Sequence, residues 1–458
     1  MSNKSIGKAA GKTSNFSANL ESVTFNSIRK VLPDKTILDA CRQANYSHRN
    51  RFITPVLTVL HMILAGIWPE ESFVASWQLL WASFAANFPS MACQSPSRGT
   101  VSNARKRLPL EVWHQIVAWL SKQGQTYSEK MDKWQGHRVV AVDGTCMTVP
   151  NTNELCETFG LSSGNYGKRS YPLVRMVCLS VVKTMIAINY RLGGYKTDEN
   201  KLLEPMLETL RKGDLLLADR HFAGANLYWL YMTNGLEYLT WAHQKLIVSR
   251  LKRLWSYGAN DFVARLKIGD VYRRKNPEMP KYIKARFIQV KTRIRGKYQC
   301  IWLVTSLLDA KYPANEIAGL YLRRWRIETL FRQFKIDLNA DILRSKSSNA
   351  IYKEIAARIC AINIVHTIML ETAIANNVDI TRISFIHTIR AIVAFAPALA
   401  MQPANQLPTI YQAMLREIAA HLVPLRPGRL EPRKLAHDPK HYPRLKTTRA
   451  QWRKQNAA

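Results

Sequence analysis

The sequence predicts an α/β protein, a mixed sheet covered by helices, from three observations. Residues 26–130 have helical periodicity, residues 137–241 alternate short apolar strands with helices, and residues 282–307 alternate apolar and basic positions as β-strands do. At 458 residues and 47% hydrophobic composition, the chain can bury a sizeable core and form two or three domains. This composition excludes a disordered chain.

The first helical segment runs from residue 26 to residue 130. Apolar positions recur three and four residues apart in "TILDACRQ", "ITPVLTVLHMILAGIW" and "FVASWQLLWASFAANF". A basic helix after Ser and Thr caps then breaks at Pro109, and a second amphipathic helix follows. Arg105, Lys106 and Arg107 lie at this junction and could contact DNA phosphates. A solvated basic face on a helical bundle explains them equally well.

Strands are predicted from His137 onwards. "HRVVAVDGTCMTV", "YPLVRMVCLSVV" and "KTMIAINYRLGG" predict three strands, with a turn at Asp143-Gly144 in the first. A helix closed by Gly213 follows, then the apolar strand "DLLLADRHF", a short helix and the strand "LEYLTWA". This order places Asp143 on the first strand and Asp219 near the end of the fourth.

A basic β module is predicted next. Residues 250–297 contain fifteen Lys or Arg and three acidic residues, and the second half predicts an antiparallel ribbon with one charged face and a turn at Arg295-Gly296-Lys297. Such a face is a plausible phosphate platform. Helices return through Leu338 and over roughly 354–376, 381–396 and 406–422. The tail from Arg426 has ten Lys or Arg and repeated Pro, which predicts a linker or an arm on an anionic partner.

The formal net charge of +34 comes from 66 Lys and Arg against 32 Asp and Glu and predicts a polyanionic partner, nucleic acid first. The apolar run 52–68 is too short and too polar to span a bilayer, and no membrane partner is expected. The first twenty residues lack the apolar segment of a signal peptide, so a cytoplasmic, nucleoid-associated protein is expected. Seven scattered cysteines without a CxxC pair predict reduced core thiols.

The helix predicted over "YLRRWRIETLFRQFKIDL", residues 321–338, has an unusual polar face. At 100° per residue, Tyr321, Arg324, Glu328 and Lys335 fall within a wedge of roughly 60° beside an apolar stripe. An exposed Arg324–Glu328 pair at i,i+4 would contribute only about 0.3–0.5 kcal/mol and is the simplest interpretation of the helix alone.

Three carboxylates give this face a second interpretation. Asp143, Asp219 and Glu328 lie on predicted elements of one α/β unit, so they could converge at one edge of the sheet. Clustered carboxylates are stabilised by hard divalent cations, Mg²⁺ or Mn²⁺. Two such ions about 4 Å apart can activate a nucleophile and stabilise the leaving oxygen of a phosphodiester. Tyr321, Arg324 and Lys335 would then bind the backbone beside the reacting phosphate.

These motifs resemble those of a known family. Tyr321, Arg324, Glu328 and Lys335 match the spacing of the Y-R-E-K signature of bacterial insertion-sequence DDE transposases of the insertion-sequence-four type. "VVAVDGT" and "LLLADRHF" are similar to the first and second acidic motifs of that family. "PSRGTVSNARKRLP" is similar to its N-terminal region, and the likeness covers roughly residues 25–450.

The resemblance implies roles for individual residues. Asp143, Asp219 and Glu328 would be catalytic metal ligands for two Mg²⁺ or Mn²⁺ ions per site. Tyr321, Arg324 and Lys335 would contact DNA near the cleaved end. Trp302 in "IWLVTS" matches the position of an aromatic residue that stacks on a base flipped from a hairpinned end, and it fits a core strand residue equally well.

The resemblance also implies an architecture. An RNase H-like catalytic domain at 131–345 would carry a β insertion at about 245–300. A helical DNA-binding domain at 26–130 would precede it, behind a disordered tail at 1–25. Helices at 346–425 and the basic tail at 426–458 would follow it.

The implied activity is cut-and-paste DNA transposition. Cleavage at the terminal inverted repeats, through a hairpin, would be followed by joining to target DNA, with a homodimer in the synaptic complex. Two other functions stay open at this point: an RNase H-like nuclease without strand transfer, and a catalytically silent DNA-binding regulator.

Overall fold

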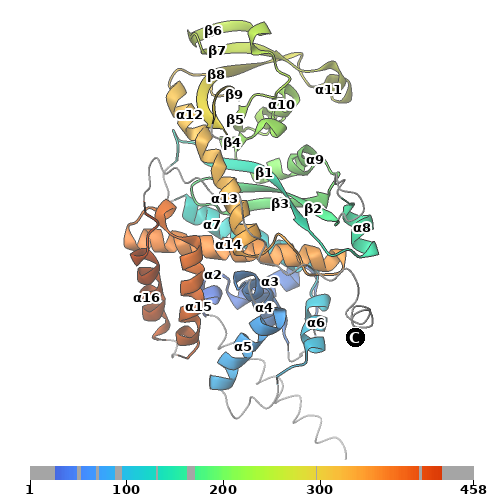
Figure 1. Cartoon of the computed structure of the whole chain (residues 1–458), viewed down its shortest axis with the longest axis vertical. Helices are drawn as coiled ribbons and strands as arrows, with labels where there is room; N and C mark the ends of the chain where they lie inside the picture. Colours follow the sequence, from blue (N-terminus) through green and yellow to red (C-terminus); the bar gives the residue numbers. More distant parts are fainter. Residues whose placement is uncertain are drawn as a thin grey trace, which may run out of the picture. The chain divides into compact units, whose positions relative to one another are not determined.

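The chain, seen in a computed structural model, forms one nine-stranded sheet packed with helices (Figure 1). The structure describes residues 26–48, 53–68, 72–87, 95–129, 133–161, 171–294, 297–401 and 405–424. The described residues up to Leu422 form one compact unit. The predicted tails at 1–25 and 426–458, and Arg295-Gly296 of the predicted turn, lie outside the described residues. The domain boundaries stay a prediction.

Helices occupy the described part of the N-terminal segment, as its periodicity predicts. They are α2 (Asn26–Val31), α3 (Asp34–Gln43), α4 (Pro55–Ile67), α5 (Phe73–Asn87), α6 (Arg98–Arg107) and α7 (Leu110–Ser128). The Thr54 hydroxyl caps α4 by accepting a hydrogen bond from the Leu57 amide at 3.2 Å, and Pro55 occupies the first turn. Every residue of α4 is buried, as its apolar sequence requires.

The sheet begins with the predicted succession of strands and helices. Its elements are β1 (Val139–Thr148), α8 (Asn153–Phe159), β2 (Leu173–Val181), β3 (Ala187–Gly194), α9 (Glu199–Leu203), β4 (Leu215–Ala218), α10 (Ala225–Thr233) and β5 (Glu237–Trp241). The predicted turn at Asp143-Gly144 is wrong, because β1 continues through both residues and pairs with β2 as far as Thr148. Helix α8 was not predicted.

The sheet divides the apolar core into two clusters, one on each face. β1, β2 and β3 are antiparallel neighbours, whereas β4 and β5 run parallel to β1. Alternate residues of a strand face opposite sides of the sheet. Ala141 accordingly joins one apolar cluster, together with helices α4, α7 and α14. Val140 and Val142 join a second cluster on the other face, with α10.

The basic β module extends this same sheet. Its elements are β6 (Lys252–Gly258), β7 (Asp261–Lys267), α11 (Asp270–Lys275), β8 (Tyr282–Ile294) and β9 (Lys297–Thr305). β8 and β9 pair antiparallel as predicted, and β9 joins the module to β5. Arg286 of β8 departs from the predicted charged face: it is 2% exposed, forms an ion pair with Asp261 and donates hydrogen bonds to backbone carbonyls.

The helix predicted over 321–338 is composite. α12 (Ala314–Leu322) is followed by a 3₁₀ turn (Arg323–Trp325), α13 (Arg326–Arg332) and a π-helical turn (Gln333–Asp337). Turns that are tighter and wider than an α-helix change the angular offset between residues, so one uniform α-helical face is a wrong description. The apolar stripe is confirmed, since Ile327, Leu330, Phe331, Phe334 and Leu338 are all buried.

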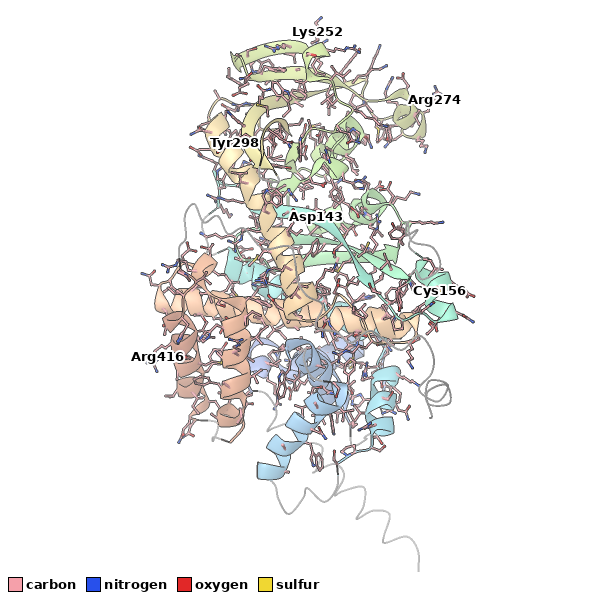
Figure 2. All side chains as sticks on the ribbon, viewed as in Figure 1. Asp143, Cys156, Lys252, Arg274, Tyr298 and Arg416 are labelled. Atoms are coloured by element: carbon pink, nitrogen blue, oxygen red, sulfur yellow. The ribbon has the colours of Figure 1, made fainter. Side chains whose placement is uncertain are left out.

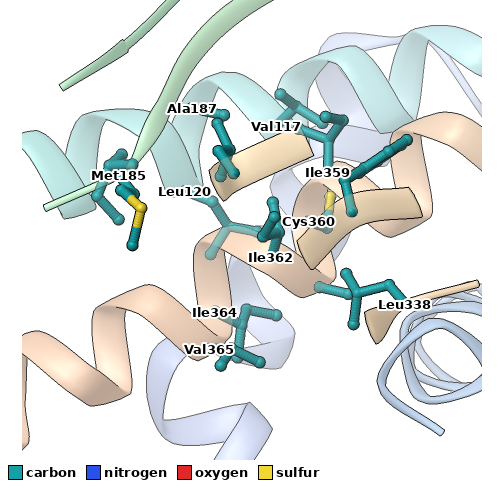
Figure 3. Packing of buried hydrophobic residues seen from close by; sticks show 14 of the residues in the cluster. Val117, Leu120, Met185, Ala187, Leu338, Ile359, Cys360, Ile362, Ile364 and Val365 are labelled. Carbon is teal, nitrogen blue, oxygen red and sulfur yellow. The ribbon is translucent and has the colours of Figure 1, made fainter. Parts of the chain in front are cut away.

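The last helices pack against the first ones. α14 (Ser348–Asn376) contacts α4 and α7, and α15 (Phe385–Met401) and α16 (Leu407–Ala420) pack beside it. Figure 3 shows Ile359, Cys360 and Ile362 of α14 near Val117 and Leu120 of α7. Among the described residues, α14 alone is long and apolar enough to cross a membrane, and 78% of its apolar window is buried in protein. Core helices meet the same criterion, so no membrane span follows.

The cysteine prediction holds in part. Six described cysteines are free thiols. Cys41, Cys178 and Cys360 are buried as predicted. Cys300 is exposed and Cys146 and Cys156 are partly buried, so the prediction of core thiols is wrong for these three. Cys93 lies outside the described residues.

Candidate active site

Asp143 and Asp219 lie at the same level of two neighbouring strands. β1 and β4 pair in parallel, with Val139 opposite Leu215 and Ala141 opposite Leu217. Two residues further along the chain are Asp143, which lies within β1, and Asp219, which directly follows β4. β4 ends at Ala218, so Asp219 lies at its carboxyl end, where its side chain accepts a hydrogen bond from the His221 amide at 2.8 Å.

The composite helix brings Glu328 to this edge of the sheet. The Tyr321 hydroxyl donates to the Ala218 carbonyl at 3.3 Å and so joins the helix to the end of β4. The Arg324 guanidinium contacts Asp143 Oδ2 at 3.3 Å and Glu328 Oε1 at 3.0 Å. Figure 2 shows Asp143 beside the ribbon of α13. The i,i+4 pair expected from sequence is therefore present, but Arg324 is only 8% exposed and also pairs with an acid 181 residues away.

The electrostatics show that this edge of the sheet disfavours negative charge. Burial raises the pKa of Asp143 to about 6, the Gly144 amide and Arg324 oppose this rise, and the charges of Asp219 and Glu328 add to it. Between Asp143 and Glu328, positive charge comes from the Arg324 guanidinium, whose Nε is buried without a hydrogen bond among the described residues. Arg324 thus joins Asp143 and Glu328, and Asp219 acts on Asp143 through its charge.

The raised pKa predicts how Asp143→Asn changes stability with pH. An aspartate with a raised pKa is protonated in the folded state and ionised in the unfolded state between pH 3.8 and about 6, so stability falls as pH rises through this window. Above this pH window, the ionised Asp143 side chain lowers the free energy of unfolding by roughly 3 kcal/mol. We expect Asp143→Asn to raise the melting temperature of metal-free protein at pH 7.5 and to have no effect near pH 3.5.

Thermal unfolding monitored by circular dichroism in EDTA at several pH values measures this. Glu208→Gln, at an exposed glutamate, is the control and should show no such trend. A destabilised Asp143→Asn at pH 7.5 would contradict the electrostatic account.

A fourth acid near the site was missed by the sequence interpretation. The Glu199 carboxylate of α9 lies against Gly144, where an added Cβ would come within 2.5 Å of it. Glu199 also pairs with Arg175 at 3.2 Å and lies 3.8 Å from His221 Nε2. Glycine at 144 thus leaves room for this carboxylate. In the sequence, the only hint of this close contact was Gly144, and it was predicted to form a turn with Asp143.

Lys335 and Trp302 make other contacts. Lys335 Nζ pairs with Asp341 at 2.8 Å. Trp302 on β9 packs edge-to-face on Phe262 with ring centres 5.6 Å apart. It is partly buried, which is what the alternative prediction of a core strand residue describes. A DNA role for either residue stays a prediction.

The three basic residues of the α6–α7 junction are not equivalent. The Arg105 guanidinium stacks on Phe73 at 3.6 Å, and burial lowers the pKa of Arg105. Lys106 is exposed and its carbonyl accepts a hydrogen bond from Lys353 Nζ, while Arg107 is partly buried. Lys106 is therefore the most accessible of the three for a phosphate.

The carboxylate set fits divalent metal ions of one kind. Asp143, Asp219 and Glu328 offer only oxygen donors, which suits Mg²⁺ or Mn²⁺. Acids within a strand, at the end of its neighbour and on a helix, in a chain with an excess of 34 positive charges, are typical of enzymes that act on the phosphodiesters of nucleic acids.

Comparison with known proteins gives the family. Residues 134–364, about half of the chain, match the family described as "Transposase DDE domain", and the chain belongs to this family. It is 27% identical over 278 residues to the transposase InsG for insertion sequence element IS4 of Escherichia coli, covering 60% of this chain and 61% of InsG. It is 26% identical over 168 residues to a probable transposase for insertion sequence element IS5377 of Geobacillus stearothermophilus, covering 37% of this chain and 40% of that protein. The predicted resemblance to insertion-sequence-four-type transposases is confirmed.

A solved structure aligns over most of the chain with a low score. The piggyBac transposase synaptic complex with hairpin DNA aligns at 10% identity and a TM-score of 0.38, over 90% of this chain and 86% of that one. A likeness of this size does not establish a shared fold.

Proposed function

We propose that the chain is a DNA transposase that cuts the ends of an insertion sequence and joins them to target DNA. The observation that carries this is that Arg324 joins Asp143 of β1 to Glu328 of the composite helix, beside Asp219 at the carboxyl end of the neighbouring strand β4. The strand order β3-β2-β1-β4-β5 supports an RNase H-like catalytic core in which β6 to β9 are an insertion.

The mechanism assigns roles to five side chains. Asp143, Asp219 and Glu328 would hold two Mg²⁺ or Mn²⁺ ions, which when bound supply an activated nucleophilic oxygen and stabilise the leaving oxygen. Arg324 orients Asp143 and Glu328 through one guanidinium and offers positive charge to the phosphate. Tyr321 fixes the position of the helix through the Ala218 carbonyl.

The β6–β9 module offers a surface for DNA. Exposed basic residues lie there among exposed aromatic side chains, and Figure 2 shows Lys252, Arg274 and Tyr298 in this region. The exposed aromatic residues are Trp255, Tyr257, Tyr272, Tyr282 and Tyr298. Cations bind phosphates and aromatic rings stack on bases, so this surface suits an opened or distorted DNA end.

Arg324→Lys tests the role of the guanidinium. A lysine keeps the charge but cannot contact two carboxylates with a planar fork, so we expect strand cleavage to slow by about a hundredfold while DNA binding is retained. Cleavage rates and gel-shift affinities measured in parallel check this. Arg332→Lys, at an exposed arginine of α13, is the matched control. Full activity of Arg324→Lys would show that only charge is required.

The decisive assay for function incubates the protein with DNA that carries the element's ends, Mg²⁺ and a target plasmid. Cut ends joined to the plasmid are expected. Cleavage without joining would favour a nuclease, and end binding with no cleavage would favour a silent regulator. Hairpinned ends on a denaturing gel would reveal the route of second-strand cleavage.

Two further parts of the proposal concern assembly. The N-terminal helices and the basic tail would recognise the ends, and two copies of the chain would act together on paired ends. The basic character of both segments supports this. Analytical ultracentrifugation that finds one protein chain on paired ends would contradict it.

A further inference from the structure

Two histidines and a glutamate meet where the start of α15 lies beside the end of α16. His387 is in the first turn of α15, Glu417 is in the last turn of α16, and His421 directly follows that helix. Glu417 and His421 are four residues apart and therefore lie on the same side of the helix. Ile383 and Leu422 form an antiparallel β-bridge close by, which fixes both segments.

The spacing of the three side chains is close to that of metal ligands. One ligand atom from each residue lies within 4.8 Å of the others. His421 Nδ1 is 3.4 Å and His387 Nε2 is 4.0 Å from Glu417 Oε1. Tetrahedral zinc with bonds of about 2.1 Å places its ligands roughly 3.4 Å apart. The distance from His421 to Glu417 already matches, and the distance from His387 to Glu417 would need to shorten by roughly 0.6 Å. The ligand atoms of the two histidines lie within 4.8 Å of each other and would also have to approach.

An ordinary hydrogen-bonded cluster does not account for all of these contacts. His421 Nδ1 lies 3.2 Å from the Glu417 carbonyl and 3.4 Å from the Glu417 carboxylate. These two contacts give His421 Nδ1 polar partners without a metal. His387 Nε2, however, is buried and makes no hydrogen bond within the part of the chain that the structure describes. A buried polar atom without a hydrogen bond is costly, and a metal ion would supply the missing interaction.

An ion can reach this cluster from solvent. The side chains of Glu417 and His421 are 46% and 57% exposed, whereas that of His387 is 26% exposed. The cluster thus has one inner ligand and two outer ones. Three ligands from the protein leave a fourth position for water.

We propose that His387, Glu417 and His421 bind one zinc ion that ties the end of α16 to the start of α15. Two imidazoles and a carboxylate suit zinc, whereas the proposed catalytic site has oxygen donors alone and suits magnesium. On binding, His421 Nδ1 exchanges its contact with the Glu417 carbonyl for the metal. The site is distinct from Asp143, Asp219 and Glu328 and does not depend on the proposed function.

Retention of zinc by the purified protein tests the proposal. Untagged full-length protein is stripped with EDTA, supplied with zinc and dialysed against zinc-free buffer that contains millimolar Mg²⁺. We expect about one zinc ion per chain by mass spectrometry of the metal content, and a higher melting temperature than for the stripped protein. His387→Gln with His421→Gln should weaken zinc binding at least tenfold in competition with a chromophoric chelator and abolish the shift in melting temperature.

Controls separate this site from others. His114→Ala, at an exposed histidine of α7, should bind zinc as the wild type does. Glu417→Gln changes an exposed residue that the fold tolerates, and it should also lose zinc. Cobalt in place of zinc should give a spectrum without a thiolate charge-transfer band, which excludes the cysteines. Equal zinc retention by the wild type and the double variant, or none by the wild type, would overturn the proposal.

Discussion

Glu328→Gln is expected to abolish DNA strand cleavage, with a loss of at least about a thousandfold at saturating Mg²⁺. The amide removes one negative oxygen ligand and keeps the size of the side chain, so cation binding weakens while the helix stays in place. The Glu328 side chain is 43% exposed and pairs with Arg324, so the fold should tolerate the change. Single-turnover cleavage of labelled end DNA measures the loss.

The matched control is Glu316→Gln, at an exposed glutamate of α12. It should cleave at the wild-type rate, and both variants should bind end DNA with unchanged affinity. Cleavage by Glu328→Gln within tenfold of the wild type would exclude Glu328 as a metal ligand.

Glu354→Ala is expected to destabilise the fold by about 3–5 kcal/mol, because it leaves a buried cation without its partner. Glu354 is 1% and Arg358 is 5% exposed at the side chain, and their charged atoms lie 3.1 Å apart. Glu354 also accepts a hydrogen bond from the Ser345 amide at 2.9 Å, while Arg358 donates to the Leu338 carbonyl at 3.2 Å. The pair therefore joins α14 to the chain that follows the composite helix.

Denaturant unfolding followed by tryptophan fluorescence measures this change. Glu354→Met combined with Arg358→Met should recover most of the lost stability, since two apolar side chains leave no unpaired charge. Lys267→Ala, which removes an exposed partner of Asp270, should change stability by less than about 1 kcal/mol. A loss below 1 kcal/mol for Glu354→Ala would show that the pair is solvated.

Local patterns in the sequence predicted much of the fold. Apart from the unpredicted α8, the order of strands and helices from His137 to Trp241 follows from hydrophobic periodicity, as do the helical segments and the antiparallel β8–β9 ribbon. The apolar stripe on the composite helix follows from the same rule. The placement of Asp143 on the first strand and Asp219 at the end of the fourth required only the strand order.

The predictions that failed concerned features that depend on contacts between residues far apart in the sequence. Gly144 suggested a turn, but it lies within β1, where the lack of a side chain leaves room for the Glu199 carboxylate. Arg286 looked like one charge among many on a ribbon, and only its pairing with Asp261 shows that it is buried. The π-helical turn that contains Lys335 was not predicted either, because hydrophobic periodicity does not reveal such a turn, and the DNA role of Lys335 stays a prediction.

The central claim is that Asp143, Asp219 and Glu328 bind divalent cations beside a DNA phosphate. Crystals of the protein with end DNA and Mn²⁺, measured at the manganese absorption edge, test it directly. The account predicts anomalous density in contact with carboxylate oxygens of all three residues and with a phosphate. Manganese bound elsewhere, with these three side chains directed to separate surfaces in the DNA-bound protein, would contradict it.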